Sequence, residues 1–123
     1  MTTRHFAPVL ATLLLLALAG CTVASGREIG IVAGERNSNP AMYFEPKRVT
    51  ARAGENVTFV VRNDGAVDHE FESGEAGIGE VIVPPGRTRR VAFEAPSKPG
   101  EYPVYCDLAG HREAGMELVL VVE

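Results

Sequence analysis

The sequence predicts an all-β domain, a sandwich or barrel of about seven or eight strands. Short segments rich in Val, Ile, Phe and Thr alternate apolar and polar side chains, as half-buried strands do. Gly, Pro, Asn and Asp residues separate these segments. No stretch beyond Glu28 keeps a helical hydrophobic period over three turns. Many short strands in about 100 residues favour an antiparallel sandwich or barrel.

The clearest strand covers residues 56–62, where Val57, Phe59 and Val61 fall on one face because side chains alternate along a strand. The complete set of predicted strands, in chain order, is residues 28–33, 47–51, 56–62, 69–73, 81–83, 89–94, 101–106 and 116–122. The turn signals between them are Ala53-Gly54, Asn63-Asp64-Gly65, Pro84-Pro85-Gly86 and Pro99-Gly100. The polar segment 34–41 predicts a loop.

The N-terminus has the pattern of a secretory leader. Arg4 precedes a charge-free apolar run from residue 6 to residue 20, which is shorter than the roughly 20 residues that span a bilayer as a helix. The run ends in Leu18-Ala19-Gly20-Cys21, which resembles the bacterial lipobox, in which the Cys becomes the lipid-modified first residue. An ordinary secretory cleavage after Ala19 fits the same residues.

We therefore expect three parts in this chain. Residues 1–20 are a lipoprotein signal peptide, residues 21–40 are a lipid-anchored tether and N-terminal segment, and residues 41–123 are the main domain. The expected location is exported, periplasmic or at the cell surface, with lipid attached at Cys21. Both cleavage alternatives export the domain.

Charge excludes one class of partner. The chain has 12 Lys and Arg against 16 Asp and Glu, a net charge of -4 and a pI near 5.4. Binding to nucleic acid depends mainly on Lys and Arg side chains that displace counterions from phosphates. We therefore expect no nucleic-acid partner.

The two cysteines leave a choice. Export permits a disulfide between Cys21 and Cys106. A lipid-anchored Cys21 on a flexible tether does not favour that bridge. Cys106 is then an unpaired thiol in an oxidising compartment, which is a liability unless something occupies it.

Potential metal ligands are concentrated near the C-terminus. In YCDLAGHREAGM, four residues separate Cys106 from His111 and four separate His111 from Met116. A loop of this size between two strands can direct all three side chains at one centre. His69 lies on an earlier strand, on the same face as Phe71, and therefore points to the core. We expect these side chains to meet in a water-poor pocket.

Taken singly, each residue has a structural explanation: a hydrogen-bonded core histidine, a small buried thiol, a gap-filling methionine. Taken together, two imidazoles, a thiolate and a weak thioether describe the trigonal plus axial site of blue copper. Zinc is the natural competitor, but its fourth ligand is normally Cys, His, carboxylate or water. The residues therefore favour one copper ion.

The chain resembles the cupredoxins, the family of plastocyanin-like and azurin-like domains, from about residue 42 to residue 122. The features that carry the resemblance are FEPKRVTARAGENVTFVVRN, the strand-borne DHEF, PPGRTRRVAFEAPSKPGEYPVYC and CDLAGHREAGM. The resemblance implies an eight-stranded Greek-key sandwich holding one type 1 copper ion. It implies His69, Cys106 and His111 as equatorial ligands and Met116 as the axial ligand.

Two positions depart from the family pattern. Glu70 follows the first histidine, where many relatives have an Asn whose side chain ties the ligand loops together. Leu118 stands where relatives often have Gly. Neither change removes a ligand, and the backbone amide of Glu70 can still donate to the thiolate.

We expect the protein to be no enzyme but a carrier of single electrons between exported protein partners, such as a cytochrome, an oxidase or a reductase. We also expect the protein to be a monomer. Two histidines in the exported part are too few for a trinuclear oxidase cluster, and one loop cysteine is too few for a binuclear centre. The alternatives are a periplasmic copper store or chaperone, a metal-free interaction module, and a thiol hydrolase using Cys106.

Overall fold

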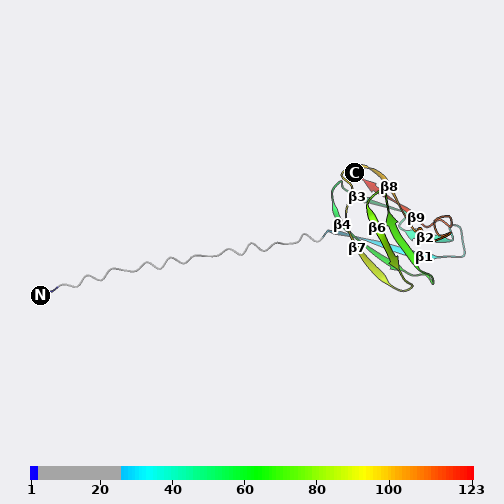
Figure 1. Ribbon diagram of the computed structural model, residues 1–123, viewed down its shortest axis with the longest axis horizontal. Coiled ribbons are helices and arrows are strands. Elements are labelled where there is room, and N and C mark those ends of the chain that lie inside the picture. Colours follow the sequence, from blue (N-terminus) through cyan, green and yellow to red (C-terminus); the bar gives the residue numbers. More distant parts are fainter. Residues whose placement is uncertain (3–25) are drawn as a thin grey trace.

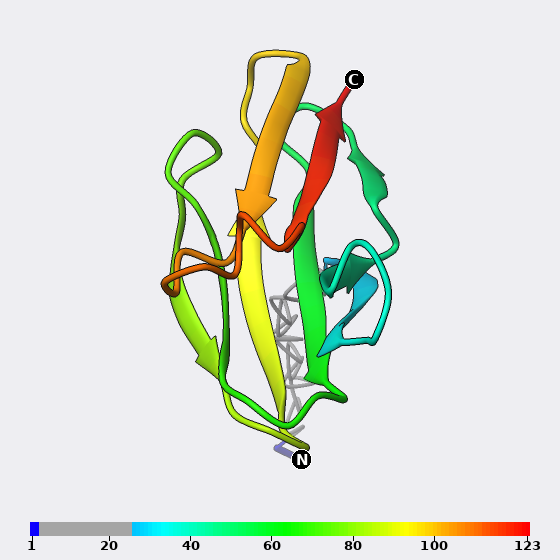
Figure 2. The same cartoon turned by 90° about the vertical axis from the view of Figure 1, so that its right-hand side faces the viewer.

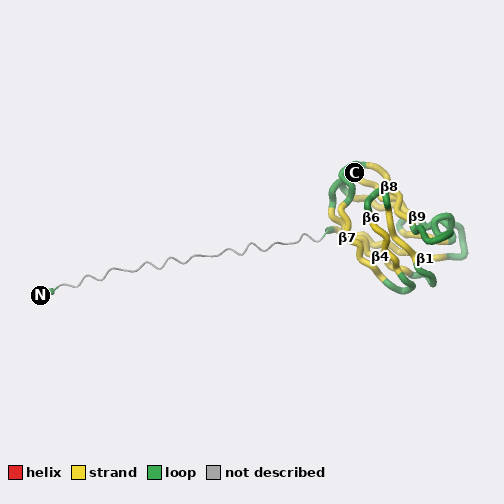
Figure 3. The backbone as a smooth tube through the Cα atoms, viewed as in Figure 1, coloured by secondary structure: helices red, strands yellow, loops and turns green. Residues whose placement is uncertain are grey.

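The computed structural model describes residues 1–2 and 26–123, and these form strands joined by turns and loops (Figures 1 and 3). Residues 3–25, which include Cys21 and nearly all of the predicted leader, lie outside the described residues. The nine strands are β1 (Arg27–Glu35), β2 (Met42–Glu45), β3 (Arg48–Ala51), β4 (Asn56–Asn63), β5 (His69–Ser73), β6 (Ile78–Val83), β7 (Thr88–Glu94), β8 (Gly100–Tyr105) and β9 (Glu117–Val122). Within the described residues there is no helix long and apolar enough to cross a membrane.

The strands form two sheets. One has the order β2-β1-β4-β7, and the other has the order β3-β9-β8-β5-β6. Figure 2 shows β8 and β9, in orange and red, side by side and joined by a loop at one end. The pairs β1–β4 and β3–β9 are parallel, whereas the other pairs are antiparallel. Because the chain crosses repeatedly between the sheets, neighbouring strands are often distant in sequence. In two of the pairs, the two strands run parallel to each other.

The predicted fold class is confirmed, and each predicted strand has a counterpart. Three details differ. The sequence favoured antiparallel pairing, but two of the strand pairs are parallel. The four-residue strand β2, ahead of Pro46, was not predicted. Strand β1 continues to Glu35, into the segment expected to be a loop, because its end pairs with β2.

Aromatic side chains fill the space between the sheets. Phe44, Phe59 and Phe71 are fully buried and come from β2, β4 and β5. The Phe71 ring lies 5.5 Å from Phe44, edge-on, and 5.2 Å from Phe59, measured between ring centroids. Such pairs add to the stability gained from apolar burial. Phe71 therefore joins the two sheets two residues after His69.

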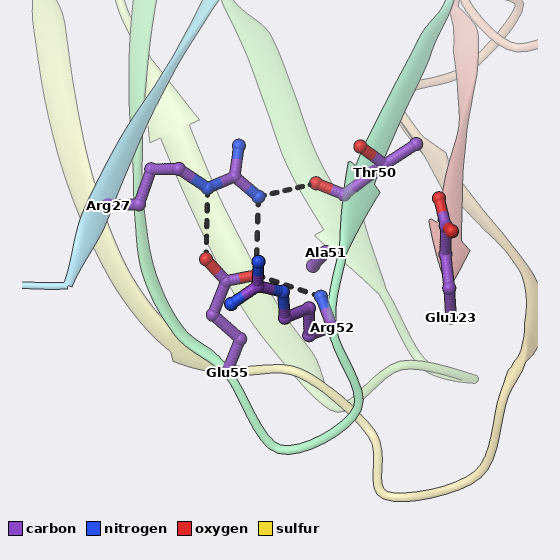
Figure 4. A pocket seen from close by; sticks show the side chains of 6 residues that line it. All are labelled: Arg27, Thr50, Ala51, Arg52, Glu55 and Glu123. Carbon is purple, nitrogen blue, oxygen red and sulfur yellow. Dashed lines mark hydrogen bonds and ion pairs between the residues drawn. The ribbon is translucent and has the colours of Figure 1, made fainter.

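A charged cluster ties the start of β1 to the loop before β4 (Figure 4). Arg27 donates from Nε to Glu55 at 2.9 Å and from Nη2 to the carbonyl of Thr50 at 2.7 Å. The backbone N–H of Arg52 donates to the Glu55 carboxylate at 2.8 Å. These hydrogen bonds lower the pKa of Glu55 to about 2.

This pKa predicts an acid-dependent contribution to stability. Glutamate in an unfolded chain has a pKa of about 4.3, so the folded state holds the ionised form more tightly. The contribution of the Glu55 charge should be complete above about pH 5 and should disappear as the pH falls towards 2. Urea denaturation of wild type and Glu55→Gln across this range should show the difference between them shrinking with acid. Glu94→Gln, at an exposed end of β7, is the control, and a difference independent of pH would contradict the prediction.

Candidate metal centre

The loop of residues 106–116 joins β8 to β9 and brings its own ends together. Cys106 donates its backbone N–H to the carbonyl of Met116 at 3.2 Å, and Met116 donates to the carbonyl of His111 at 3.1 Å. Gly115 has a φ of +99°, and a Cβ there would lie 2.3 Å from Cβ of Pro40. Glycine is therefore required both by the backbone conformation and by the close approach.

Three predicted site residues converge at this loop. Nδ1 of His111 lies 3.4 Å from Nδ1 of His69 and 3.3 Å from Sγ of Cys106. The three ligand atoms lie within 4.8 Å of one another. Metal bonds of about 2.0–2.3 Å place two ligands of one ion no more than about 4.6 Å apart. The spacing of the donor atoms thus suits a single ion.

The strand ends explain why these side chains meet. Cys106 is the first residue after β8, whereas the sequence placed it inside the strand, and His69 is the first residue of β5. The two strands are neighbours in the same sheet, with Glu72 opposite Tyr105. Both Cys106 and His69 are fully buried, and His111 is partly exposed.

Met116 lies at the other end of the loop, immediately before β9. Its side chain is fully buried in the core, and its backbone hydrogen-bonds to both Cys106 and His111. Nζ of Lys47 donates to the carbonyls on either side of it, at 2.7 Å to Gly115 and 3.0 Å to Glu117. The ammonium group of Lys47 therefore holds the backbone around Met116, a role that the sequence pattern did not suggest.

The surroundings of the thiol favour metal binding over free reactivity. Burial raises the pKa of Cys106, so the metal-free side chain is a neutral thiol at pH 7. The backbone N–H of Glu70 points at Sγ at 3.3 Å, as expected from its place after His69. A thiolate formed on metal binding would accept this hydrogen bond.

Glu70 is buried although it does not share the face of His69. Strand alternation turns its side chain away from the face of His69 and Phe71, yet the residue is only 6% exposed. Burial, together with the nearby Glu72, Glu80 and Asp107, raises its pKa to about 7. Both faces of β5 are therefore covered at this point.

A second loop, residues 64–68, leads into His69 and is held by two side chains. Asn63, fully buried, donates to the carbonyls of Val67 and Val83 at 2.7 and 2.8 Å and accepts from the N–H of Gly65 at 2.8 Å. The Glu35 carboxylate accepts hydrogen bonds from the backbone N–H groups of Ala66 and Val67 in the same loop. The sequence had assigned Asn63 to a turn and Glu35 to a polar loop, and only the pairing of β1 with β4 brings them to this end.

The donor set fits copper better than zinc. Two imidazole nitrogens and one buried sulfur lie around one point, with a buried methionine in the same loop. Imidazole and thiolate with a weak thioether suit copper, whereas a thioether is not a usual zinc ligand. Backbone ties at both loops limit how far these groups can move.

Comparison with known proteins agrees with the fold. A family model described as a cupredoxin-like domain matches residues 8–120. Plastocyanin of Prochlorothrix hollandica is 31% identical over 130 aligned positions, covering 98% of this chain and 94% of that protein. The copper-resistant cuproprotein CopI of Rubrivivax gelatinosus is 32% identical over 100 positions, covering 66% of this chain.

The chain spans 60% of that CopI protein and 26% of CopI from Pseudomonas aeruginosa, so it matches only part of each. Among solved structures, reduced auracyanin of Roseiflexus castenholzii superposes with a TM-score of 0.65 at 24% identity, covering 80% of this chain and 98% of that one. A multicopper oxidase superposes with a TM-score of 0.64 but is covered over only 42% of its length. These structures show a shared fold.

The family match, the two-sheet sandwich and the donor cluster lead to one conclusion. The chain belongs to the cupredoxin family, whose blue copper members bind copper and transfer electrons.

Proposed function

We propose that this protein is an exported mononuclear blue-copper protein that carries single electrons between protein partners. His69, Cys106, His111 and Met116 are its proposed ligands. The observation that carries the proposal is the cluster of three donor atoms around His111. Its Nδ1 lies 3.4 Å from Nδ1 of His69 and 3.3 Å from the buried Sγ of Cys106.

The proposed mechanism depends on rigidity. When bound, copper would supply a one-electron Cu(II)/Cu(I) couple. His69 lies at the start of a strand, and Cys106 and Met116 lie at the two ends of a loop closed by backbone hydrogen bonds. Ligands held in this way change position little between the two charge states, which keeps the reorganisation barrier low.

The proposed path for electrons leads through His111. His69 and Cys106 are fully buried, whereas His111 is partly exposed, so it is the imidazole that can approach a partner. Beside it, the guanidinium of Arg112 lies 3.9 Å from the ring centre of Tyr105 and pairs with Glu117 at 2.9 Å. The surface around the site therefore carries both apolar and charged groups, suited to a partner that binds briefly.

The second candidate function is a copper store or chaperone for copper resistance. Its support is the similarity to two proteins named copper-resistant cuproproteins. The carrier has more support from the site itself, because buried ligands tied by backbone hydrogen bonds suit retention of the metal. A transfer site would be expected to expose its ligands.

Three further assignments accompany the proposal. The protein would be an electron carrier rather than an enzyme, because the donor cluster among the described residues provides one centre for one metal ion. Residues 1–20 would be removed, with residues 21–40 linking a lipid on Cys21 to the domain of residues 41–123. The strand β1 of that linking segment is also part of the sandwich, between β2 and β4. A monomer would meet its partners on the exported side of the membrane.

Copper addition tests the function directly. Purified protein given one equivalent of Cu(II) should turn intensely blue, bleach with a reductant and recover its colour with an oxidant through many cycles. The measurements are visible and spin-resonance spectra, followed by competition with a copper chelator. A colourless Cu(II) complex, or copper lost readily to the chelator, would contradict the carrier and favour the store or chaperone.

A further inference from the structure

His69 has a second ring nitrogen that faces away from the proposed metal position. Its Nδ1 lies 3.4 Å from Nδ1 of His111, whereas its Nε2 is buried without a hydrogen-bond partner among the described residues. The nearest carboxylate oxygen is Oε2 of Glu35, at 3.6 Å from Nε2. This distance is a few tenths of an ångström beyond a hydrogen bond, and a buried N–H without a partner is costly.

Glu35 is held in this position by the loop that precedes His69. It is the last residue of β1, and its carboxylate accepts the backbone N–H of Ala66 at 3.1 Å and of Val67 at 3.0 Å. The carboxylate therefore has its own fixed anchor, independent of His69. A small shift of either side chain within this arrangement would complete the bond to Nε2.

Gly65 leaves the space that the carboxylate occupies. A Cβ built on Gly65 would lie 1.7 Å from Oε2 of Glu35 and 2.6 Å from its Cδ. The φ of Gly65 is not in the left-handed region, so the requirement for glycine here is one of space. The loop is thus fitted around a carboxylate directed at His69.

The chemistry of imidazole gives this contact a consequence. A neutral ring carries one proton, and only the tautomer protonated on Nε2 leaves the Nδ1 lone pair available to a metal. A carboxylate acceptor at Nε2 selects this tautomer and makes Nδ1 a stronger donor. Burial lowers the pKa of His69, while the negative charge of Glu35 opposes that effect.

We propose that Glu35 is a positioning residue of the metal centre, whose carboxylate accepts Nε2–H of His69, fixes the ring with Nδ1 towards the metal, and favours Cu(II) over Cu(I). Its effect on copper rests on the proposed function. Its effect on the tautomer of His69 does not, because that proton can be observed without any metal.

The first test uses the metal-free protein. Long-range ¹H–¹⁵N NMR of the histidine rings should show the His69 proton on Nε2 in wild type. Glu35→Ala should shift the proton towards Nδ1 or produce a mixture of tautomers. The control is Glu28→Gln on the same strand, because Glu28 pairs with Arg90 at the surface, and it should leave the ring unchanged. A wild-type proton on Nδ1, or an unchanged ring in Glu35→Ala, would overturn the proposal.

The second test uses copper-loaded Glu35→Gln, which keeps the size of the side chain and an acceptor oxygen. Losing the negative charge should weaken Cu(II) binding about tenfold relative to Cu(I) binding. This is the lower end of the roughly 10–100-fold loss of metal affinity that changes beside a metal ligand typically cause. A tenfold change corresponds to a potential about 59 mV higher for one electron. If Glu35 only anchored the loop, Glu35→Gln would lower the urea midpoint and leave the reduction potential unchanged. That result would also overturn the proposal.

Gly65→Ala gives an independent test, because it displaces the carboxylate without removing it. It should shift the tautomer in the same direction as Glu35→Ala. In a Glu35→Ala background the same substitution should add little, since the clashing group is gone. Fully additive effects on the ring would contradict the proposal. If the wild type binds no copper, the proposed function fails, while the two tautomer measurements still decide the role of Glu35.

Discussion

Cys106→Ser should abolish the intense blue colour of the copper-loaded protein. The colour of such a site arises from charge transfer between a thiolate and Cu(II), and a serine hydroxyl offers no comparable donor. Cys106 is fully buried, with Sγ 3.3 Å from Nδ1 of His111. We expect Cu(II) affinity to fall by at least the 10–100-fold that changes in outer-sphere groups typically cost. Visible and spin-resonance titrations with Cu(II) measure both effects.

Cys21→Ser is the matched control for this substitution. It removes the other cysteine of the chain and should leave colour and affinity unchanged. A blue complex in Cys106→Ser would show that Cys106 is not the thiolate ligand. Loss of colour in both variants would point instead to a joint requirement for the two thiols, contrary to the proposed mononuclear site.

Phe71→Ala should strongly destabilise the folded protein. Phe71 is fully buried and packs against two other phenylalanines, Phe44 and Phe59, at 5.5 and 5.2 Å. Removing a buried phenylalanine ring typically costs about 3–5 kcal/mol, because both apolar burial and packing contacts are lost. That is a large part of the roughly 5–15 kcal/mol available to a domain. Urea unfolding of the metal-free protein gives the free energy of unfolding directly.

Val67→Ala is the control for Phe71→Ala. Val67 is 42% exposed and lies in the loop before His69, so trimming it should change the free energy of unfolding by no more than about 0.5 kcal/mol. A loss below about 1 kcal/mol in Phe71→Ala would show that the two sheets close over the missing ring. The aromatic cluster would then not be the main link between them.

Much of the site was predictable because it depends on local spacing. Cys106, His111 and Met116 lie in one loop, and a loop between two strands must bring its ends together. His69 could be placed from the alternation of its strand. The same rule did not reveal that Glu70 is buried, since alternation describes which side a residue faces and not whether that side is covered; the residue is 6% exposed.

The supporting residues could not be predicted in this way. Glu35 lies far from His69 in sequence. Its carboxylate lies 3.6 Å from the imidazole only because β1 pairs in parallel with β4 and ends beside the loop that follows β4. Lys47 reaches the carbonyls around Met116 for a similar reason, since β3 pairs in parallel with β9. Neither parallel pairing was expected from the sequence.

The sequence by itself determined the all-β class, nearly every strand and the residues proposed to bind copper, because alternation, turn residues and ligand spacing act over short distances along the chain. Only the tertiary structure decided which strands are neighbours, and therefore which distant groups surround His69 and Met116. Strand pairing is set by how whole faces pack together, so the groups that position the ligands follow from the complete fold.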